Sequence, residues 1–132
     1  MYMCTTSVEQ VCIKISQGPY TVKEWFKHDV HAASDARVLR LIRKLGTAGY
    51  GLWWMVVEWL YANEGAMPEG AVADVAYSLR VKEEEFAPFL QVAVECGLIT
   101  LTDGAYRNDR VTAALEARHD LSTKRASAVQ ER

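Results

Sequence analysis

The segment from Ser34 to Leu60 constrains the fold more than any other, because a cationic stretch runs directly into an almost wholly apolar one. Its first half has apolar residues at the spacing of one helix face. These residues are Val38, Leu41, Ile42 and Leu45. Ser34 or Asp35 can cap this helix, and Gly46 can adopt the positive-φ conformation that ends one. The basic residues fall on the opposite face: Arg37, Arg40, Arg43 and Lys44. The pattern predicts a helix whose outer side is cationic, either as a binding surface or as an ordinary solvated face.

The second half of this segment predicts a helix that opens at Gly49 and Gly51 and ends near residues 63–65. Its apolar residues are Leu52, Trp53, Met55, Val56, Val57, Trp59 and Leu60. A helix that is apolar on nearly all sides is normally buried by its neighbours. We therefore expect a central buried helix in a compact helical core, with glycines that allow close approach of backbone or neighbour.

Composition narrows the class of protein. The chain has 132 residues, half of them hydrophobic, which suits one domain with a real core. A net charge of −2 means that any nucleic-acid contact must come from a local patch. The three cysteines, Cys4, Cys12 and Cys96, form no CxxC pair, which fits a reducing compartment. The longest apolar run is far shorter than the ~20 residues of a membrane span. We expect a cytoplasmic protein without membrane contact.

Before and after the central segment, the chain alternates between helix and turn signals. Residues 1–20 form an N-terminal extension in which Val11, Ile13 and Ile15 alternate with other residues, as in a short strand, although a helix end or loose tail is equally compatible. Pro68 suits the first turn of a third helix. The apolar stripe of that helix is Val72, Val75, Ala76 and Leu79.

A fourth helix is predicted over residues 83–96, with Pro88 either kinking it or marking its regular start. Residues 98–101 and 105–107 then flank a Thr-Asp-Gly turn, which predicts a β-hairpin. A final helix follows Asp109, and its polar end is expected to fray or to continue as a linker.

The order of helix, helix and hairpin, with extra helices before them, is that of a winged helix-turn-helix. Residues 25–110 resemble the winged-helix domain of phage and mobile-element proteins related to DnaD-type replication initiation and primosome components. The matching passages are WFKHD at 25–29, Asp35 with its arginine-bearing helix, GTAGYGLWWMVVE at 46–58, and residues 94–106. The resemblance implies a mainly α fold with a small β-hairpin, and DNA association, assembly at a replication fork, or both.

The expected organisation is therefore an extension at 1–20, a winged-helix domain at 21–110, and a C-terminal helix with a polar tail at 111–132. Because the domain usually precedes further sequence in that family, the chain is either a stand-alone copy or a fragment.

The charge of the fourth helix qualifies the DNA expectation. In a winged helix the second helix of the motif normally enters the major groove. Here four glutamates oppose one lysine there, a balance that phosphates repel. The candidate nucleic-acid-binding residues are Arg40, Arg43, Lys44, Lys82, Arg107 and Asn108. The candidate partner-binding residues are Glu83, Glu84, Glu85 and Trp54.

No nucleophile–base pair, phosphate loop or paired carboxylate set is evident, so no catalytic residue, cofactor or small-molecule substrate is expected. The cluster of His28, Asp29, His31 and Asp35 could hold a metal, but capping and hydrogen bonding are the favoured roles. The aromatic residues could stack on single-stranded bases, although a core role is favoured.

Two functions remain open. One is a non-enzymatic winged-helix module of a phage or mobile-element replication or regulatory protein, which binds DNA weakly, mediates assembly, or does both. The other is a stand-alone phage inhibitor of a host defence or regulatory complex such as CRISPR, which binds protein through the acidic helix without DNA. A protein partner or self-association is expected in either case.

Overall fold

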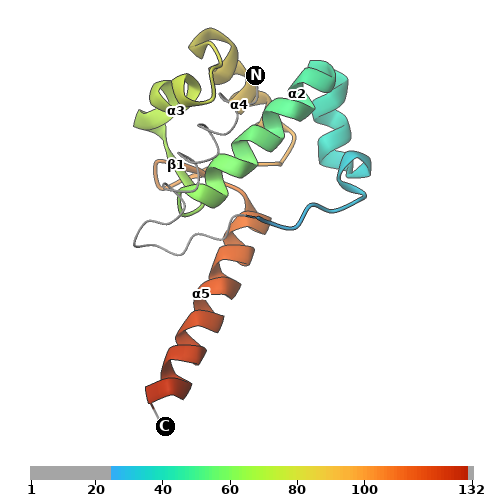
Figure 1. Cartoon of the computed structure of the whole chain (residues 1–132). Helices are drawn as coiled ribbons and strands as arrows, with labels where there is room; N and C mark the ends of the chain where they lie inside the picture. The colour runs from blue at the N-terminus through green and yellow to red at the C-terminus, as the bar shows by residue number, and fades with distance from the viewer. Residues whose placement is uncertain (1–24, 131–132) are drawn as a thin grey trace, which may run out of the picture.

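A computed structural model describes residues 25–130, and the possible strand within residues 1–20 lies outside this range (Figure 1). In chain order the elements are η1 (Ala32–Ser34), α2 (Ala36–Ala62), β1 (Ala66–Pro68), η2 (Glu69–Ala71), α3 (Val72–Ser78), α4 (Glu83–Glu95), β2 (Thr100–Thr102), β3 (Ala105–Arg107) and α5 (Asp109–Gln130). The expectation of a mainly helical fold with a small antiparallel sheet is confirmed.

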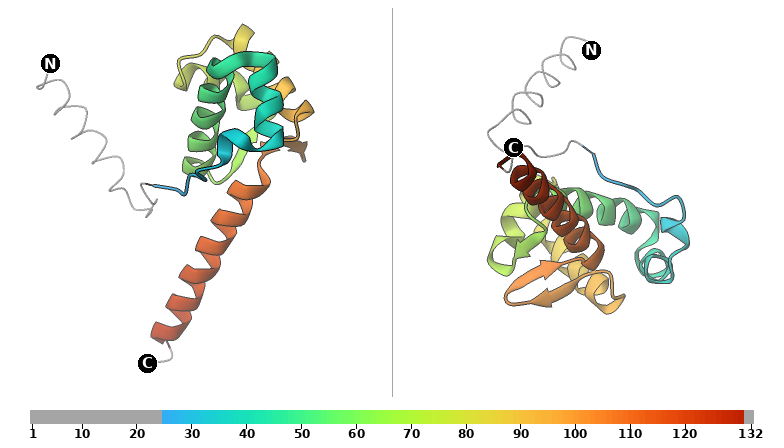
Figure 2. Two further views of the ribbon diagram at one scale, coloured as in Figure 1. Left: turned by 90° about the vertical axis from the view of Figure 1, so that its right-hand side faces the viewer. Right: turned by 90° about the horizontal axis from the view of Figure 1, so that it is seen from below.

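Helix α2 consists of two arms that meet at Gly46, as predicted. The carboxylate of Asp35 caps the first arm by accepting a hydrogen bond from the backbone N–H of Arg37. Gly46 has φ 73° and ψ −169°, a conformation essentially confined to glycine. The chain therefore turns sharply there, and the two arms run in different directions (Figure 2). We call residues 36–45 the N-terminal arm and residues 47–62 the C-terminal arm.

The C-terminal arm provides one wall of the core, and α4 provides another. The buried apolar residues of the C-terminal arm are Trp53, Val56, Val57 and Leu60. They belong to the same hydrophobic core as Phe86, Phe89, Leu90 and Ala93 of α4. The prediction that this helix is buried almost all round is wrong for its outer face. Met55 is exposed, and Leu52 and Trp59 are half-buried, because none of the elements within residues 25–130 covers that side.

The sheet has the order β1-β3-β2, with both pairs antiparallel. Asp103 and Gly104 connect β2 to β3 with φ of 52° and 74°, the positive pair that a two-residue hairpin turn requires. Pro68 was expected to begin a helix but instead ends β1, and α3 begins only at Val72. A proline is tolerated here because β1 is an edge strand.

Helix α4 is continuous from Glu83 and contains Pro88, so its regular part does not begin at the proline. Helix α5 continues to Gln130, so the polar residues expected to fray or to continue as a linker are helical as far as the structure describes them. Its C-terminal half stands away from the other elements that the structure describes (Figures 1 and 2). Among the described helices, none is long and apolar enough to cross a membrane.

Candidate functional site

The cationic side of the N-terminal arm is divided between paired and unpaired residues. The side chains of Arg40 and Arg43 are exposed, and neither has an ion pair or hydrogen bond within residues 25–130. Lys44 instead lies 3.3 Å from Glu95 Oε2, an exposed ion pair that joins the arm to the end of α4. Arg37 is held by Asp35 through contacts of 3.3 and 3.5 Å. The charge available to a partner on this arm is thus that of Arg40 and Arg43.

The remaining candidates for nucleic-acid binding do not join this pair in one patch. Lys82 precedes the first residue of α4, whereas Lys44 contacts its last residue, and 13 helical residues separate these ends by about 18 Å. Arg107 lies across the hairpin, where its Nη1 donates to the carbonyl oxygen of Thr102 at 2.6 Å.

Asn108 is buried and serves the fold. Its Nδ2 donates to the carbonyl oxygen of Leu98 at 2.6 Å, and its Oδ1 accepts from the backbone N–H of Val111 at 3.0 Å. The side chain therefore ties the segment after α4 to the first turn of α5. It is not part of an exposed cationic surface.

The candidate partner-binding residues are also separated. Glu83, Glu84 and Glu85 are exposed in the first turn of α4, where negative charge is favourable beside the helix dipole. Trp54 is half-buried on the C-terminal arm, with the ring of His28 stacked on it at 3.8 Å. Within residues 25–130 the acidic turn is left uncovered, whereas Trp54 is covered by another part of the chain.

That cover is residues 25–29, which we call the N-terminal strap. In addition to the His28 stack, Phe26 stacks on Tyr61 of the C-terminal arm with ring centroids 4.5 Å apart. Arg118 of α5 donates from Nη2 to the carbonyl oxygen of Trp25 at 3.2 Å. The strap is therefore held against both α2 and α5.

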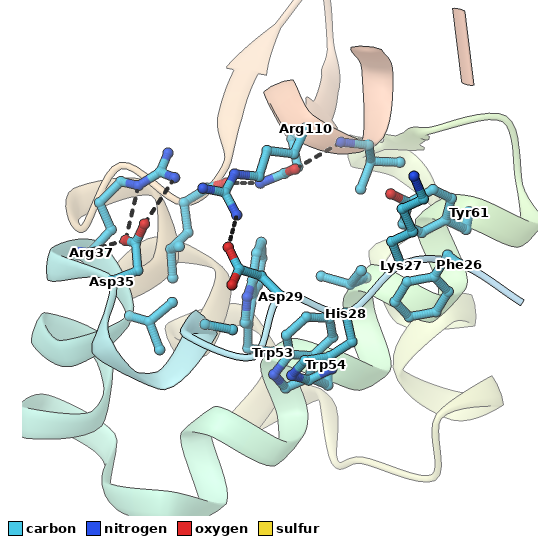
Figure 3. Close-up of a pocket in the computed structure, with 16 residues that line it drawn as sticks. Phe26, Lys27, His28, Asp29, Asp35, Arg37, Trp53, Trp54, Tyr61 and Arg110 are labelled. Atoms are coloured by element: carbon cyan, nitrogen blue, oxygen red, sulfur yellow. Dashed lines mark hydrogen bonds and ion pairs between the residues drawn. The ribbon is translucent and has the colours of Figure 1, made fainter. Parts of the chain in front are cut away.

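A cavity of about 550 Å³ lies between the strap, the two arms of α2 and the start of α5 (Figure 3). Its apolar lining comes from five different elements or loops and includes Phe26, Ala32, Val38, Trp53, Val57, Leu98 and Val111. Sequence reasoning missed this cavity, because no local pattern indicates that these residues meet. The resemblance noted for WFKHD is the one sequence signal that coincides with it.

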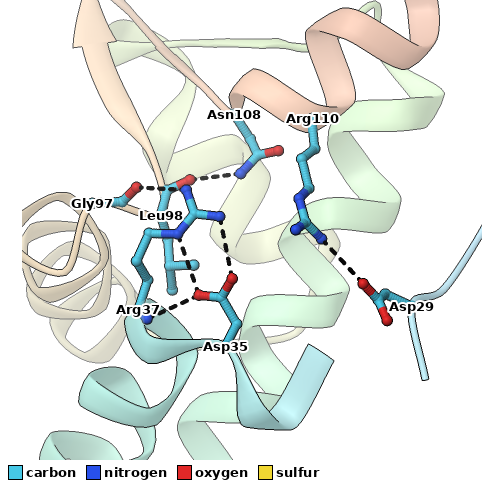
Figure 4. A network of polar contacts seen from close by, with 7 residues as sticks. All are labelled: Asp29, Asp35, Arg37, Gly97, Leu98, Asn108 and Arg110. Atoms are coloured by element: carbon cyan, nitrogen blue, oxygen red, sulfur yellow. Dashed lines mark hydrogen bonds and ion pairs between the residues drawn. The ribbon is translucent and has the colours of Figure 1, made fainter. Parts of the chain in front are cut away.

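Charged groups surround the cavity in two ion pairs (Figure 4). The Arg37 guanidinium beside Asp35 lowers the pKa of that carboxyl, and Arg37 Nη1 also donates to the Gly97 carbonyl oxygen at 3.4 Å. Arg110 Nη1 lies 3.7 Å from Asp29 Oδ2, which is beyond hydrogen-bonding distance. The first pair is a closed network, and the second is loose.

The histidines near the strap have structural contacts. His28 stacks on Trp54, and the backbone N–H of His31 donates to Asp29 Oδ1 at 2.8 Å. Within the part of the chain that the structure describes, no three His, Cys, Asp or Glu side chains are grouped to hold a metal ion.

The family model described as Lin1244/Lin1753-like, N-terminal, matches residues 25–112. The matched region thus begins at the strap and ends in the first turn of α5. No curated protein and no solved structure is significantly similar to the chain.

Proposed function

The chain belongs to the Lin1244/Lin1753-like, N-terminal family, and we propose that its matched region is a non-enzymatic winged-helix module that contacts the DNA backbone through the N-terminal arm of α2. We assign it to a replication or regulatory protein of the phage and mobile-element type. The resemblance of residues 25–29 and 46–58 to such proteins supports this assignment.

The element order supports the winged-helix part of the proposal. The C-terminal arm of α2 is followed by β1, α3, α4 and the β2–β3 hairpin. Strand β1 pairs with β3, so the hairpin extends a sheet that begins between the first two helices. In this arrangement α3 and α4 form the helix-turn-helix and the hairpin is the wing.

The charge distribution favours the N-terminal arm over α4 as the DNA-contacting element. Three exposed glutamates occupy the first turn of α4, at the end of a recognition helix that usually contacts base edges. By contrast, Arg40 and Arg43 are exposed and lack acidic partners among residues 25–130. This pair of available guanidinium groups is the observation that carries the proposal.

The number of available cations predicts weak, salt-sensitive binding. Two phosphate contacts give a slope of about −1.8 for log K against log salt concentration on duplex DNA. Raising the salt concentration fourfold should then weaken binding by about 12-fold. Because two contacts supply little affinity, we expect a companion domain or a second copy to contribute to binding.

Fluorescence anisotropy with labelled duplex and single-stranded DNA tests this proposal over a series of salt concentrations. The double variant R40E/R43E should lose binding, whereas K124E/R125E should retain it. The control makes the same change in charge on the exposed end of α5. The proposal would be contradicted if the protein does not bind DNA at low salt or if its DNA affinity does not depend on salt. It would also be contradicted if both double variants lose DNA affinity equally.

The acidic turn of α4 supports a second candidate, a protein-binding module. The carboxylates of Glu83, Glu84 and Glu85 have no ion pair or hydrogen bond in the described range and form a compact anionic surface. Such a surface suits a cationic protein, including the exposed arm of a second copy or a component of a host defence complex. The oligomeric mass at low salt tests self-association: E83Q/E84Q/E85Q should reduce it, and an unchanged mass would exclude this route.

A further inference from the structure

We propose that the cavity under the N-terminal strap is a binding site for an organic carboxylate with an aromatic or branched apolar body. This site is separate from the exposed arginines of α2 and does not depend on the proposed DNA contact. No sequence motif indicated it, because its walls are assembled from distant segments.

The cavity has the size and lining of a small-ligand site. Its volume of about 550 Å³ is within the range of typical ligand pockets. Trp53 and Val57 lie on one side with Tyr61, and the buried Val111 lies at the start of α5. An aromatic ring or a branched chain could therefore leave water and pack against apolar side chains, of which Trp53 and Tyr61 are labelled in Figure 3.

The charges around the cavity favour an anion. Three cations line it, Lys27, Arg37 and Arg110, against the two carboxylates of Asp29 and Asp35. Because each guanidinium nitrogen of Arg37 already contacts Asp35 or the Gly97 carbonyl oxygen, it has less to offer a ligand than a cation without such contacts. The excess positive charge therefore resides on Lys27 and Arg110.

Arg110 is the group best placed to bind the carboxylate. Its one ionic contact within residues 25–130 is the 3.7 Å approach of Nη1 to Asp29 Oδ2, and its side chain is 64% exposed. Asp29 is itself fixed through its other oxygen, which accepts the N–H of His31. A ligand carboxylate can accept two parallel N–H bonds from the planar guanidinium, which Asp29 does not do.

Trp54 also lines the cavity. The indole Nε1 of Trp54 is buried and has no hydrogen-bond partner among the described residues. Buried N–H groups are nearly always paired in folded proteins. Because Trp54 lines the cavity, the NMR signal of its indole N–H can report whether a ligand occupies the proposed site.

The same chemistry occurs in a free aromatic acid and in the C-terminal residue of a peptide. Fluorine NMR on the full chain can separate these sources with two probes: 3-(4-fluorophenyl)propanoate, and an acetylated tripeptide that ends in 4-fluorophenylalanine. The primary amide of each probe is the uncharged control. Whichever of the two acids binds more tightly shows whether the site prefers a free aromatic acid or a peptide C-terminus. In a proton NMR spectrum, the signal of the Trp54 indole N–H should shift when either probe binds.

The variant R110Q should weaken binding of the acid by about tenfold or more while leaving the amide unaffected, because a hydrogen bond to a charged group is lost. R125Q also removes one positive charge, but from the exposed end of α5, and it should change the binding of neither the acid nor the amide. Acids that bind no more tightly than their amides, or a preference that survives R110Q, would overturn the proposal. R40E/R43E should leave probe binding unchanged, so failure of the DNA proposal and failure of this one are distinguishable.

Discussion

The imidazole ring of His28 lies on the indole ring of Trp54, with ring centroids 3.8 Å apart and planes inclined by 19°. This stack joins a segment without regular secondary structure to the long helix α2. Together with the Phe26–Tyr61 stack, it holds the strap in place as one wall of the cavity. Phe26 and Trp54, for which a core role was favoured, are half-buried and anchor this irregular segment.

Replacing His28 with alanine should loosen the strap without unfolding the domain. Aromatic pairs contribute about 0.5–1.5 kcal/mol, and here the loss is local because the core residues beneath are unchanged. Hydrogen exchange of residues 26–29 should accelerate, and tryptophan fluorescence should move to longer wavelength as Trp54 becomes hydrated. His119→Ala is the matched control, since His119 is exposed on α5. Equal exchange rates in the two variants would show that the stack does not hold the strap.

Substituting alanine for each of two glycines at the start of the C-terminal arm should change the stability of the fold in opposite directions. A Cβ at Gly49 would lie 2.5 Å from Leu45 Cβ, whereas one at Gly51 would have no neighbour within 4 Å. We expect Gly49→Ala to destabilise the fold by about 1–3 kcal/mol through overpacking at the kink. Gly51→Ala should stabilise the fold by about 0.5–1 kcal/mol, because alanine has a higher helix propensity than glycine at an exposed helix position. Urea unfolding followed by circular dichroism measures both, and similar effects would contradict the close approach at Gly49.

The carboxylate of Asp35 should give a pH-dependent contribution to stability. Hydrogen bonding from Arg37 lowers the pKa of Asp35 in the folded state. Its contribution is therefore present above the unfolded pKa of about 3.9 and is lost as pH falls through the folded pKa. Asp35→Asn keeps an oxygen for the helix cap but removes the charge, so it should be less stable than wild type near neutral pH and equal to it at strongly acidic pH.

Asp35→Ala also removes the cap, which should add a cost of about 1 kcal/mol at all pH values to the pH-dependent loss of the charge. Thermal unfolding of the three proteins across pH separates the two effects. If Asp35→Asn is still less stable than wild type at strongly acidic pH, the charge of Asp35 is not the cause of the difference in stability.

Loss of the Asn108 side chain should destabilise the junction between the hairpin and α5. Asn108→Ala would leave the Leu98 carbonyl oxygen and the Val111 N–H without their present partner, at a cost of about 1–3 kcal/mol. Asn63→Ala is a useful comparison, because Asn63 also donates to a backbone carbonyl oxygen but is exposed. Chemical unfolding should rank the alanine variant of Asn108 as clearly the less stable, and the reverse order would contradict the buried role.

Local signals were sufficient for several elements. The apolar spacing from Val38 to Leu45, the cap at Asp35 and the break at Gly46 each depend on residues within a few positions of one another. The same holds for the hairpin turn at Asp103 and Gly104. These features were predicted correctly because backbone preference and short-range hydrogen bonding determine them.

Strand β1 was missed for the converse reason. Met67 pairs with Tyr106, which lies far along the chain, and three residues with a terminal proline carry no strand periodicity of their own. The pairing of Lys44 with Glu95 and the burial of Asn108 likewise require knowledge of which segments meet. Of the six candidates for nucleic-acid binding, only Arg40 and Arg43 both lie on the N-terminal arm and lack side-chain partners within residues 25–130, and the sequence could not show this.

The sequence by itself determined where the helices and the hairpin form and which helix carries the basic side chains, since those properties follow from the residues of one or two turns. Only the tertiary structure decided which charges remain available, where the strap lies and that a cavity opens beside Arg110. These outcomes depend on packing between segments remote in the chain, and the free energy of such contacts is not encoded in any local pattern.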